Sequence, residues 1–90
     1  MLNQKLKTRA LHRAKIIAGQ LDGLIKAITK EVYCPILLEQ SLSIQRSLKS
    51  LDAFLLENHL QSHVTHQLRQ KGETEKAIAE LIKIYTLSNK

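Results

Sequence analysis

The side chains that could bind a metal lie in two short stretches of this chain. The one cysteine, Cys34, directly precedes the one proline, Pro35, within VYCPILLEQ. Three histidines follow at His59, His63 and His66, and spacings of four and three residues place them on one face of an α-helix. A thiolate with two imidazoles is a suitable ligand set for Cu(I), Zn(II), Ni(II) or Co(II).

Helix length separates these groups within one chain. His59 follows Cys34 by about 25 residues, or about 37 Å along a straight helix at ~1.5 Å per residue. After Pro35, no glycine or proline interrupts the chain before His59. An antiparallel pairing of this helix with its copy would bring Cys34 of one subunit to His59 and His63 of the other, and two-fold symmetry would form the site twice. The spacing therefore predicts a metal site shared between subunits.

Simpler interpretations of the same residues remain open. A single cysteine in a helix is usually a small buried side chain without chemistry of its own. Histidines four residues apart are also ordinary polar residues of a helix surface. A single cysteine forms no disulfide within the chain, so no intrachain disulfide can stabilise the fold.

Helical periodicity organises the chain that carries these residues. Apolar residues recurring every three, four or seven positions predict one helix over residues 4–30 and a second, longer helix over residues 35–68. The sequence RQKGET predicts a turn centred on Gly72, and Thr74 is the expected N-cap of a short third helix. No strand pattern is present. The fold class is therefore all-α, a three-helix protomer with a long second helix.

Such a protomer needs a partner to bury its apolar surface. Ninety residues form a single domain, residues 1–90, and a chain this short is marginally stable alone. Close packing against another helix would compensate for the low helix propensity of Gly19 and Gly23. The second helix carries an apolar seam that favours a partner helix, formed by Leu37, Ile44, Leu48, Leu51 and Leu55.

Composition narrows the class of function. The net charge of +6 and the isoelectric point near 9.7 favour an anionic partner such as nucleic acid, although a basic surface is also simply well solvated. No catalytic Ser/His/Asp set, phosphate-binding loop or pair of carboxylates is present, so we expect no enzyme. The N-terminal sequence lacks the apolar core of a signal peptide, and no segment is apolar enough for a membrane span, which predicts a cytoplasmic protein without membrane contact.

Three segments resemble the CsoR/RcnR family of copper-sensing and nickel/cobalt-sensing repressors. These are RAKIIAGQLDGL (13–24), YCPILLEQ (33–40) and NHLQSHVTHQ (58–67), within a resemblance over residues 5–86. The spacing of Cys34, His59 and His63 matches that of the family's metal ligands. The resemblance implies antiparallel second helices that form a dimer and then a tetramer, a dimer of dimers. It also implies a repressor that binds operator DNA without metal and releases it when metal binds.

The resemblance also bears on the choice of metal. Tyr33 matches the tyrosine that precedes the cysteine in copper sensors, and His66 and Glu80 are candidates for contacts with the ligands. Nickel/cobalt sensors add an N-terminal histidine, but Leu2 stands at that position. The set with His63 as third ligand therefore favours Cu(I), with Ni(II), Co(II) and Zn(II) as the other possibilities.

The same resemblance implies a DNA-binding surface on the first two helices. Two positions depart from the family's pattern, because Ile16 and Gln45 stand where basic residues are usual, which predicts a different operator or weaker binding. The candidate contacts with DNA are Lys5, Arg9, Arg13, Lys15, Gln20 and Arg46.

Two further hypotheses compete with a metal-sensing repressor. Cys34 could be a nucleophile in a repressor that senses formaldehyde or another electrophile, although the formaldehyde sensors of this family usually carry an acidic residue at the position of His63. A different class is a helical interaction module that binds neither metal nor specific DNA.

Overall fold

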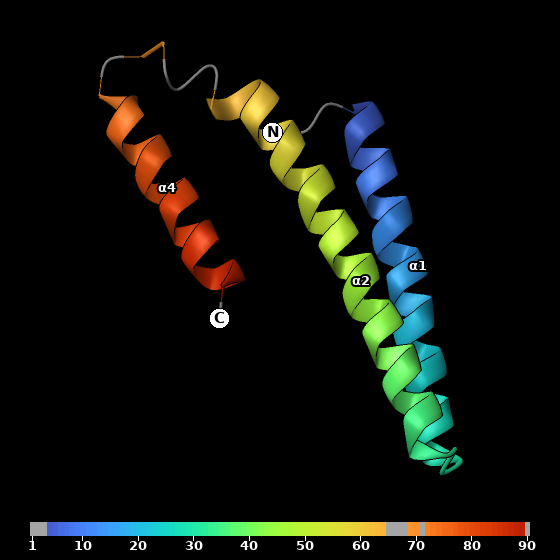
Figure 1. The fold of residues 1–90 in the computed structure, drawn as a ribbon. Coiled ribbons are helices and arrows are strands. Elements are labelled where there is room, and N and C mark those ends of the chain that lie inside the picture. Colours follow the sequence, from blue (N-terminus) through green and yellow to red (C-terminus); the bar gives the residue numbers. More distant parts are fainter. Residues whose placement is uncertain (1–3, 65–68, 71, 90) are drawn as a thin grey trace. The chain divides into compact units, whose positions relative to one another are not determined.

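The computed structural model describes residues 4–64, 69–70 and 72–89, and helices account for nearly all of them (Figure 1). No strand occurs in these ranges. The predicted all-α protomer of three helices is confirmed, but α2 has 26 residues, as many as α1, and is not the longer helix that was predicted. In chain order the elements are α1 (Gln4–Thr29), α2 (Cys34–His59), the π-helix η1 (Leu60–Val64) and α4 (Glu73–Ser88).

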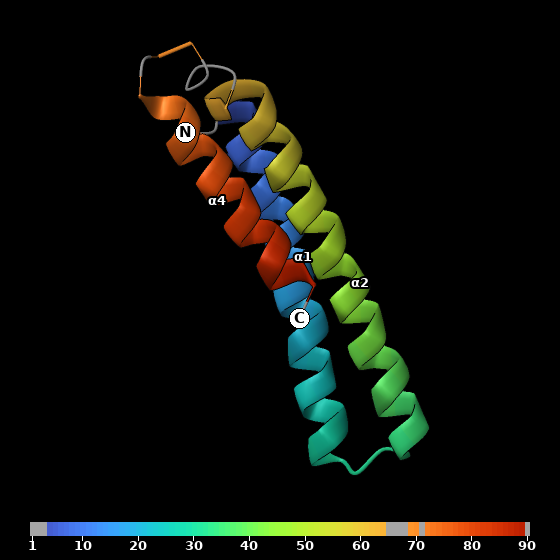
Figure 2. The same ribbon diagram turned by 60° about the vertical axis from the view of Figure 1, so that its left-hand side comes forward.

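An antiparallel hairpin of α1 and α2 forms the first compact unit, residues 2–56. The two helices lie side by side along their length in both views (Figure 1 and Figure 2). Ile17 and Ala27 of α1 and Ile44 of α2 are its buried apolar residues. Residues 57–90 belong to the second unit, in which Ala77 of α4 is buried. That residues 1–90 act as one domain stays a prediction.

A Schellman turn ends α1 and leads the chain back toward α2. The backbone N–H of Val32 donates to the carbonyl of Ala27 at 3.1 Å, and that of Glu31 donates to Ile28 at 3.0 Å. Glu31 occupies the left-handed region with φ of 56°, the position at which glycine is usual. The turn leaves only four residues, 30–33, between the two helices.

The start of α2 follows from local chemistry. The carbonyl of Tyr33 accepts hydrogen bonds from the N–H groups of Ile36 at 2.9 Å and Leu37 at 3.3 Å. Pro35 lies in the first turn, where a helix leaves its N–H groups without partners, so its missing N–H removes no hydrogen bond. The helix begins at Cys34, one residue before the predicted start.

The end of α2 differs from the prediction of a helix to residue 68. The α-helix ends at His59 and continues as the π-helix η1. The hydroxyl of Ser62 donates to the carbonyl of Asn58 at 2.6 Å. Thr8 and Ser47 make the same bond to the carbonyl four residues before them within α1 and α2, so this bond alone does not account for the π-helix. Residues 65–68 lie outside the described residues.

The N-terminus of α4 corrects a second prediction. The N-cap is Gly72, with φ of +87°, and it makes no side-chain cap hydrogen bond. Thr74 is therefore already inside the helix, and its predicted role as N-cap is wrong. Glu73 and Glu75 occupy the first turn, where their negative charges interact favourably with the helix dipole. The turn predicted around Gly72 is confirmed.

The explanation offered for the two glycines of α1 is also wrong within the protomer. A Cβ atom added at Gly19 or Gly23 would meet no atom within 4 Å. Both residues are exposed. No close approach of α2 therefore requires either glycine.

The apolar seam of α2 is only partly covered by α1. Ile44 is buried, but Leu48 is 43% exposed and Leu55 is 39% exposed. None of the described helices has the length and hydropathy needed to cross a membrane.

Candidate metal centre and nucleic-acid interface

The thiol of Cys34 lies at a position that is open to a partner. Cys34 is the first residue of α2, it is exposed, and it forms no disulfide. The neighbouring Tyr33 is 73% exposed. Cys34 begins the helix and Tyr33 directly precedes it, after the turn that ends α1.

The candidate histidines lie at the other end of the same helix. His59 is the last residue of α2 and is half-buried, and His63 belongs to η1. Glu80 is half-buried on α4, in the same compact unit as His59. His66 falls outside the described residues, so its predicted contact with the ligands stays a prediction.

One chain does not bring the candidate ligands together in the part of the structure that is described. The 26 residues of α2 hold Cys34 and His59 at opposite ends, about 37 Å apart along the axis. No group of three His, Cys, Asp or Glu side chains among the described residues could hold a metal ion. The assignment of Cys34, His59 and His63 to one site therefore stays a prediction that requires a second subunit.

A stripe of candidate DNA contacts runs along one side of α1. Lys5, Arg9, Arg13 and Gln20 follow one another at spacings of four, four and seven residues, and all four are exposed. Lys15 lies two residues after Arg13, a rotation of about 200° around the helix, so it faces another side. The stripe thus contains most, but not all, of the α1 residues predicted to contact DNA.

The two positions that depart from the family's pattern are both exposed. Ile16 lies within the stripe, with 51% of its surface exposed. On α2, the side-chain amide of Gln45 donates to the hydroxyl of Ser41 at 3.3 Å, and Arg46 is exposed beside it. An apolar side chain therefore interrupts the polar stripe of α1.

Arg13 connects this stripe to α2. Its Nη1 donates to Oγ of Ser50 at 3.5 Å, and its Cζ lies 4.6 Å from the centre of the Phe54 ring. Sequence reasoning missed Ser50 and Phe54. A signal was present, because Arg46, Ser50 and Phe54 follow at intervals of four residues on one side of α2. The rotation of α1 against α2, which brings Arg13 to that side, was not visible in the sequence.

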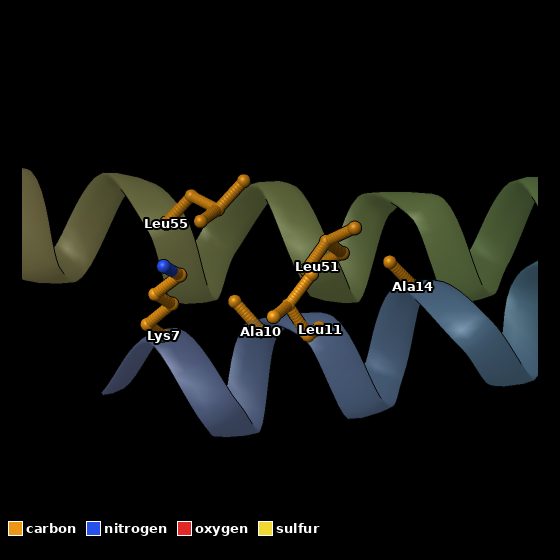
Figure 3. A pocket seen from close by; sticks show the side chains of 6 residues that line it. All are labelled: Lys7, Ala10, Leu11, Ala14, Leu51 and Leu55. Carbon is orange, nitrogen blue, oxygen red and sulfur yellow. The ribbon is translucent and has the colours of Figure 1, made fainter. Parts of the chain in front are cut away.

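An apolar groove of about 250 Å³ opens between the same two helices (Figure 3). Ala14 follows Arg13 on α1, and Leu55 follows Phe54 on α2. Each therefore lies about 100° further around its helix than the residue of the Arg13–Phe54 pair. The groove therefore opens on the other flank of the hairpin. It is lined by Lys7, Ala10, Leu11, Ala14, Leu51 and Leu55.

Comparison with known proteins finds similarity over most of this chain. The model of a family described as "Metal-sensitive transcriptional repressor" matches residues 6–86. The copper-sensing transcriptional repressor CsoR of Mycobacterium tuberculosis (strain H37Rv) is 33% identical over 76 residues, which cover 84% of this chain and 63% of that protein. The copper-sensing transcriptional repressor CsoR of Bacillus subtilis (strain 168) is 30% identical over 83 residues, which cover 92% of this chain and 81% of that protein.

A solved structure agrees with the sequence matches. The crystal structure of the copper-sensing repressor CsoR with Cu(I) from Geobacillus thermodenitrificans NG80-2 superposes with a TM-score of 0.92 at 28% identity. The superposition covers 100% of this chain and 93% of the other. The present chain spans only 63% of the length of the mycobacterial relatives it matches.

Proposed function

The chain belongs to the family of metal-sensitive transcriptional repressors, and from that premise we propose that it binds operator DNA without metal and releases it on binding Cu(I). The resemblance seen in the sequence is confirmed, and so is the expectation that the chain is not an enzyme, because the family consists of repressors. The observation that carries the proposal is an exposed thiol at the first residue of α2 with His59 at its last.

The proposed metal site contains Cys34 of one subunit with His59 and His63 of another. The residues present fit Cu(I), because the thiol of Cys34 is exposed and unbridged and the other two ligands are imidazoles. Bound Cu(I) would supply strong, directional bonds between the two subunits. The relatives named above are described as copper-sensing, which supports Cu(I) over Ni(II), Co(II) or Zn(II).

The proposed assembly pairs α2 with its antiparallel copy and joins two such dimers into a tetramer. Antiparallel pairing is the arrangement that brings the two ends of α2 together between chains. Leu48 and Leu55 support it, because a partner helix would remove from water the apolar surface that α1 leaves exposed. Tyr33, Glu80 and His66 are proposed to contact the ligands in this assembly.

The proposed DNA surface is the stripe of α1 together with Arg46 of α2. Contacts between basic residues and phosphates release counterions, so affinity should fall with salt by about 0.9 in logarithmic slope for each phosphate neutralised. Repression of this kind takes place in the cytoplasm, where reducing conditions also keep Cys34 as a thiol.

Metal and DNA are proposed to compete through the shape of the oligomer. Ligation of Cys34 to the histidines of a partner subunit would fix the start of one α2 against the end of the other. A shape that fits DNA less well would then be favoured. A coupling of ~1–3 kcal/mol lowers DNA affinity by about 5–150-fold.

The first experiment is an anaerobic titration of the fully reduced protein with Cu(I) against a competing chelator, followed by thiolate–metal absorption. We expect saturation at about one ion per chain. The variants Cys34→Ala and His59→Ala should lose tight binding, and His12→Ala, on exposed α1, is the matched control that should retain it. Tight binding that survives Cys34→Ala would contradict the proposed site.

The exposure of Cys34 also supports a second candidate, a repressor that senses an electrophile. Mass spectrometry after mild treatment with formaldehyde tests it. A stable adduct on Cys34 that weakens DNA binding, in a protein without tight Cu(I) binding, would favour this candidate over the metal sensor.

A further inference from the structure

We propose that Phe54 and Ser50 of α2 are positioning residues for Arg13, which they hold in the orientation that contacts a DNA phosphate. This inference rests on the proposed function, since it needs a DNA-binding protein. It adds to the DNA surface two uncharged residues of the second helix.

The first argument is the geometry of the contact. The guanidinium carbon of Arg13 lies 4.6 Å from the centre of the Phe54 ring, within the range of a cation–π interaction. Nη1 also donates to Oγ of Ser50 at 3.5 Å. Two groups of α2, one turn apart, therefore hold one side chain of α1 from two directions.

The second argument concerns what this contact leaves available. A guanidinium that stands over a ring uses its face, and its planar fork of N–H donors remains for oxygen acceptors. Ser50 takes up one nitrogen of Arg13, so the rest of the fork is available to a phosphate. Arg13 remains exposed despite both contacts.

The third argument is composition. The chain has one phenylalanine, and aromatic residues make up only 3% of it. That phenylalanine is half-buried beneath a cation at the flank of the hairpin, while the buried apolar residues of this unit are Ile17, Ala27 and Ile44. Phe54 is therefore not among the fully buried apolar residues of the hairpin.

The physical consequence is preorganisation. A free arginine loses rotamer freedom when it binds a phosphate, and a side chain already held loses less. Phe54 and Ser50 would therefore raise DNA affinity without touching DNA. The contribution of Phe54 should depend entirely on Arg13.

The test compares DNA affinity of the full chain and five variants across a series of salt concentrations, using the gene's upstream duplex and an unrelated duplex. Phe54→Leu keeps an apolar side chain but removes the ring, and should weaken binding about two- to fivefold. Phe54→Tyr keeps the ring and should restore wild-type affinity. Ser50→Ala should lower affinity by less than Phe54→Leu, because its hydrogen bond is long.

The deciding measurement is a double-mutant cycle. In an Arg13→Ala background, Phe54→Leu should cause no further loss of DNA affinity. Each single change should lower the salt slope by no more than about 1 unit, the value expected for losing the one phosphate contact of Arg13. An equal loss in both backgrounds would show a structural role only and would overturn the inference. Circular dichroism and Cu(I) stoichiometry, unchanged in Phe54→Leu, confirm that folding and metal binding are intact.

Failure of the proposed function has a different signature. A wild-type protein that binds neither duplex at low salt would overturn both the repressor and the phosphate contact. The ring-current shift of the Arg13 side chain in the NMR spectrum, lost in Phe54→Leu, would then still report whether the two residues are in contact. Wild-type DNA binding with an unaffected Phe54→Leu variant would overturn this inference alone.

Discussion

Cys34 and Ile16 are the single residues on which the proposed function depends most directly. The first is an exposed thiol at the start of α2, and the second is an apolar side chain within the polar stripe of α1. Cys34 should control the response to metal, and Ile16 should control the affinity for DNA. Substitutions at the two positions therefore test the two properties separately.

We expect Cys34→Ala to bind DNA like wild type and to ignore Cu(I), because the thiol is a proposed ligand and lies away from the stripe of α1. Fluorescence anisotropy of labelled operator DNA, with and without Cu(I) under anaerobic conditions, measures both properties together. Ser43→Ala, another exposed position of α2, is the control that should keep the metal response. Release by Cu(I) that persists in Cys34→Ala would remove the thiol from the mechanism.

Ile16→Lys should strengthen DNA binding. The position is 51% exposed and lies in the stripe, so a lysine there adds a phosphate contact and steepens the salt slope by about 1. Ala18→Lys adds the same charge at an exposed position two residues after Ile16, about 200° around the helix, and should leave the slope nearly unchanged. Equal gains in the two variants would show that net charge, and not the stripe, sets affinity.

The turn between α1 and α2 is a strained part of the hairpin. Glu31 has φ of 56° in a Schellman turn, a conformation that disfavours a side chain by ~1–2 kcal/mol. Glycine removes that penalty and adds ~0.5–1 kcal/mol of unfolded-state entropy. We therefore expect Glu31→Gly to raise the free energy of unfolding by up to about 1.5 kcal/mol, from the difference of these terms.

Thermal unfolding at a fixed protein concentration measures the effect of Glu31→Gly, since the stability of an oligomer depends on concentration. Glu31→Ala is the matched control, because alanine removes the same carboxylate and keeps the penalty of the left-handed conformation. An equal rise in melting temperature for Glu31→Ala and Glu31→Gly would point to the charge of Glu31 and not to its backbone.

Apolar periodicity was enough to predict that the helices exist, but not where each helix begins, ends or changes its hydrogen-bond pattern. The first helix ends within a residue of its predicted end, and Pro35 marked the start of the second. Periodicity did not reveal the change to a π-helix at Leu60, because the spacing of apolar residues does not specify which carbonyl each backbone N–H will use. Thr74 had the usual chemistry of an N-cap, but the left-handed backbone of Gly72 starts the helix earlier.

The candidate site was predictable to a different extent. The ligand types and their separation along one helix follow from the sequence, and α2 confirms that separation. The contact of Arg13 with Phe54 depends on how α1 is rotated against α2, and this rotation is a property of tertiary packing that no local pattern specifies.

At the scale of the whole molecule the repressor is proposed to be an oligomer, and mixing subunits that each lack one ligand tests which chains contribute to a site. Cys34→Ala and His59→Ala should each bind no Cu(I) tightly. In a mixed dimer, Cys34 of the His59→Ala subunit meets His59 of the Cys34→Ala subunit. One of the two sites is therefore complete, and the other lacks both groups. After random exchange, about one quarter of wild-type capacity should return.

A copper titration of the exchanged mixture, against each variant alone, measures this recovery. Mixing Cys34→Ala with His63→Ala is a second pair that should behave in the same way, whereas mixing His59→Ala with His63→Ala should recover nothing. Recovery in that last pair, or none in the first, would contradict a site made from Cys34 of one subunit and both histidines of another.

The continuity of α2 gives it the mechanics of a lever. Its 26 residues extend for about 39 Å at ~1.5 Å per residue. A tilt of about 4° about one end of a rod of that length displaces the other end by nearly 3 Å, the length of a hydrogen bond. A small adjustment where the thiol is held is therefore amplified along the helix into a shift large enough to break or make a polar contact.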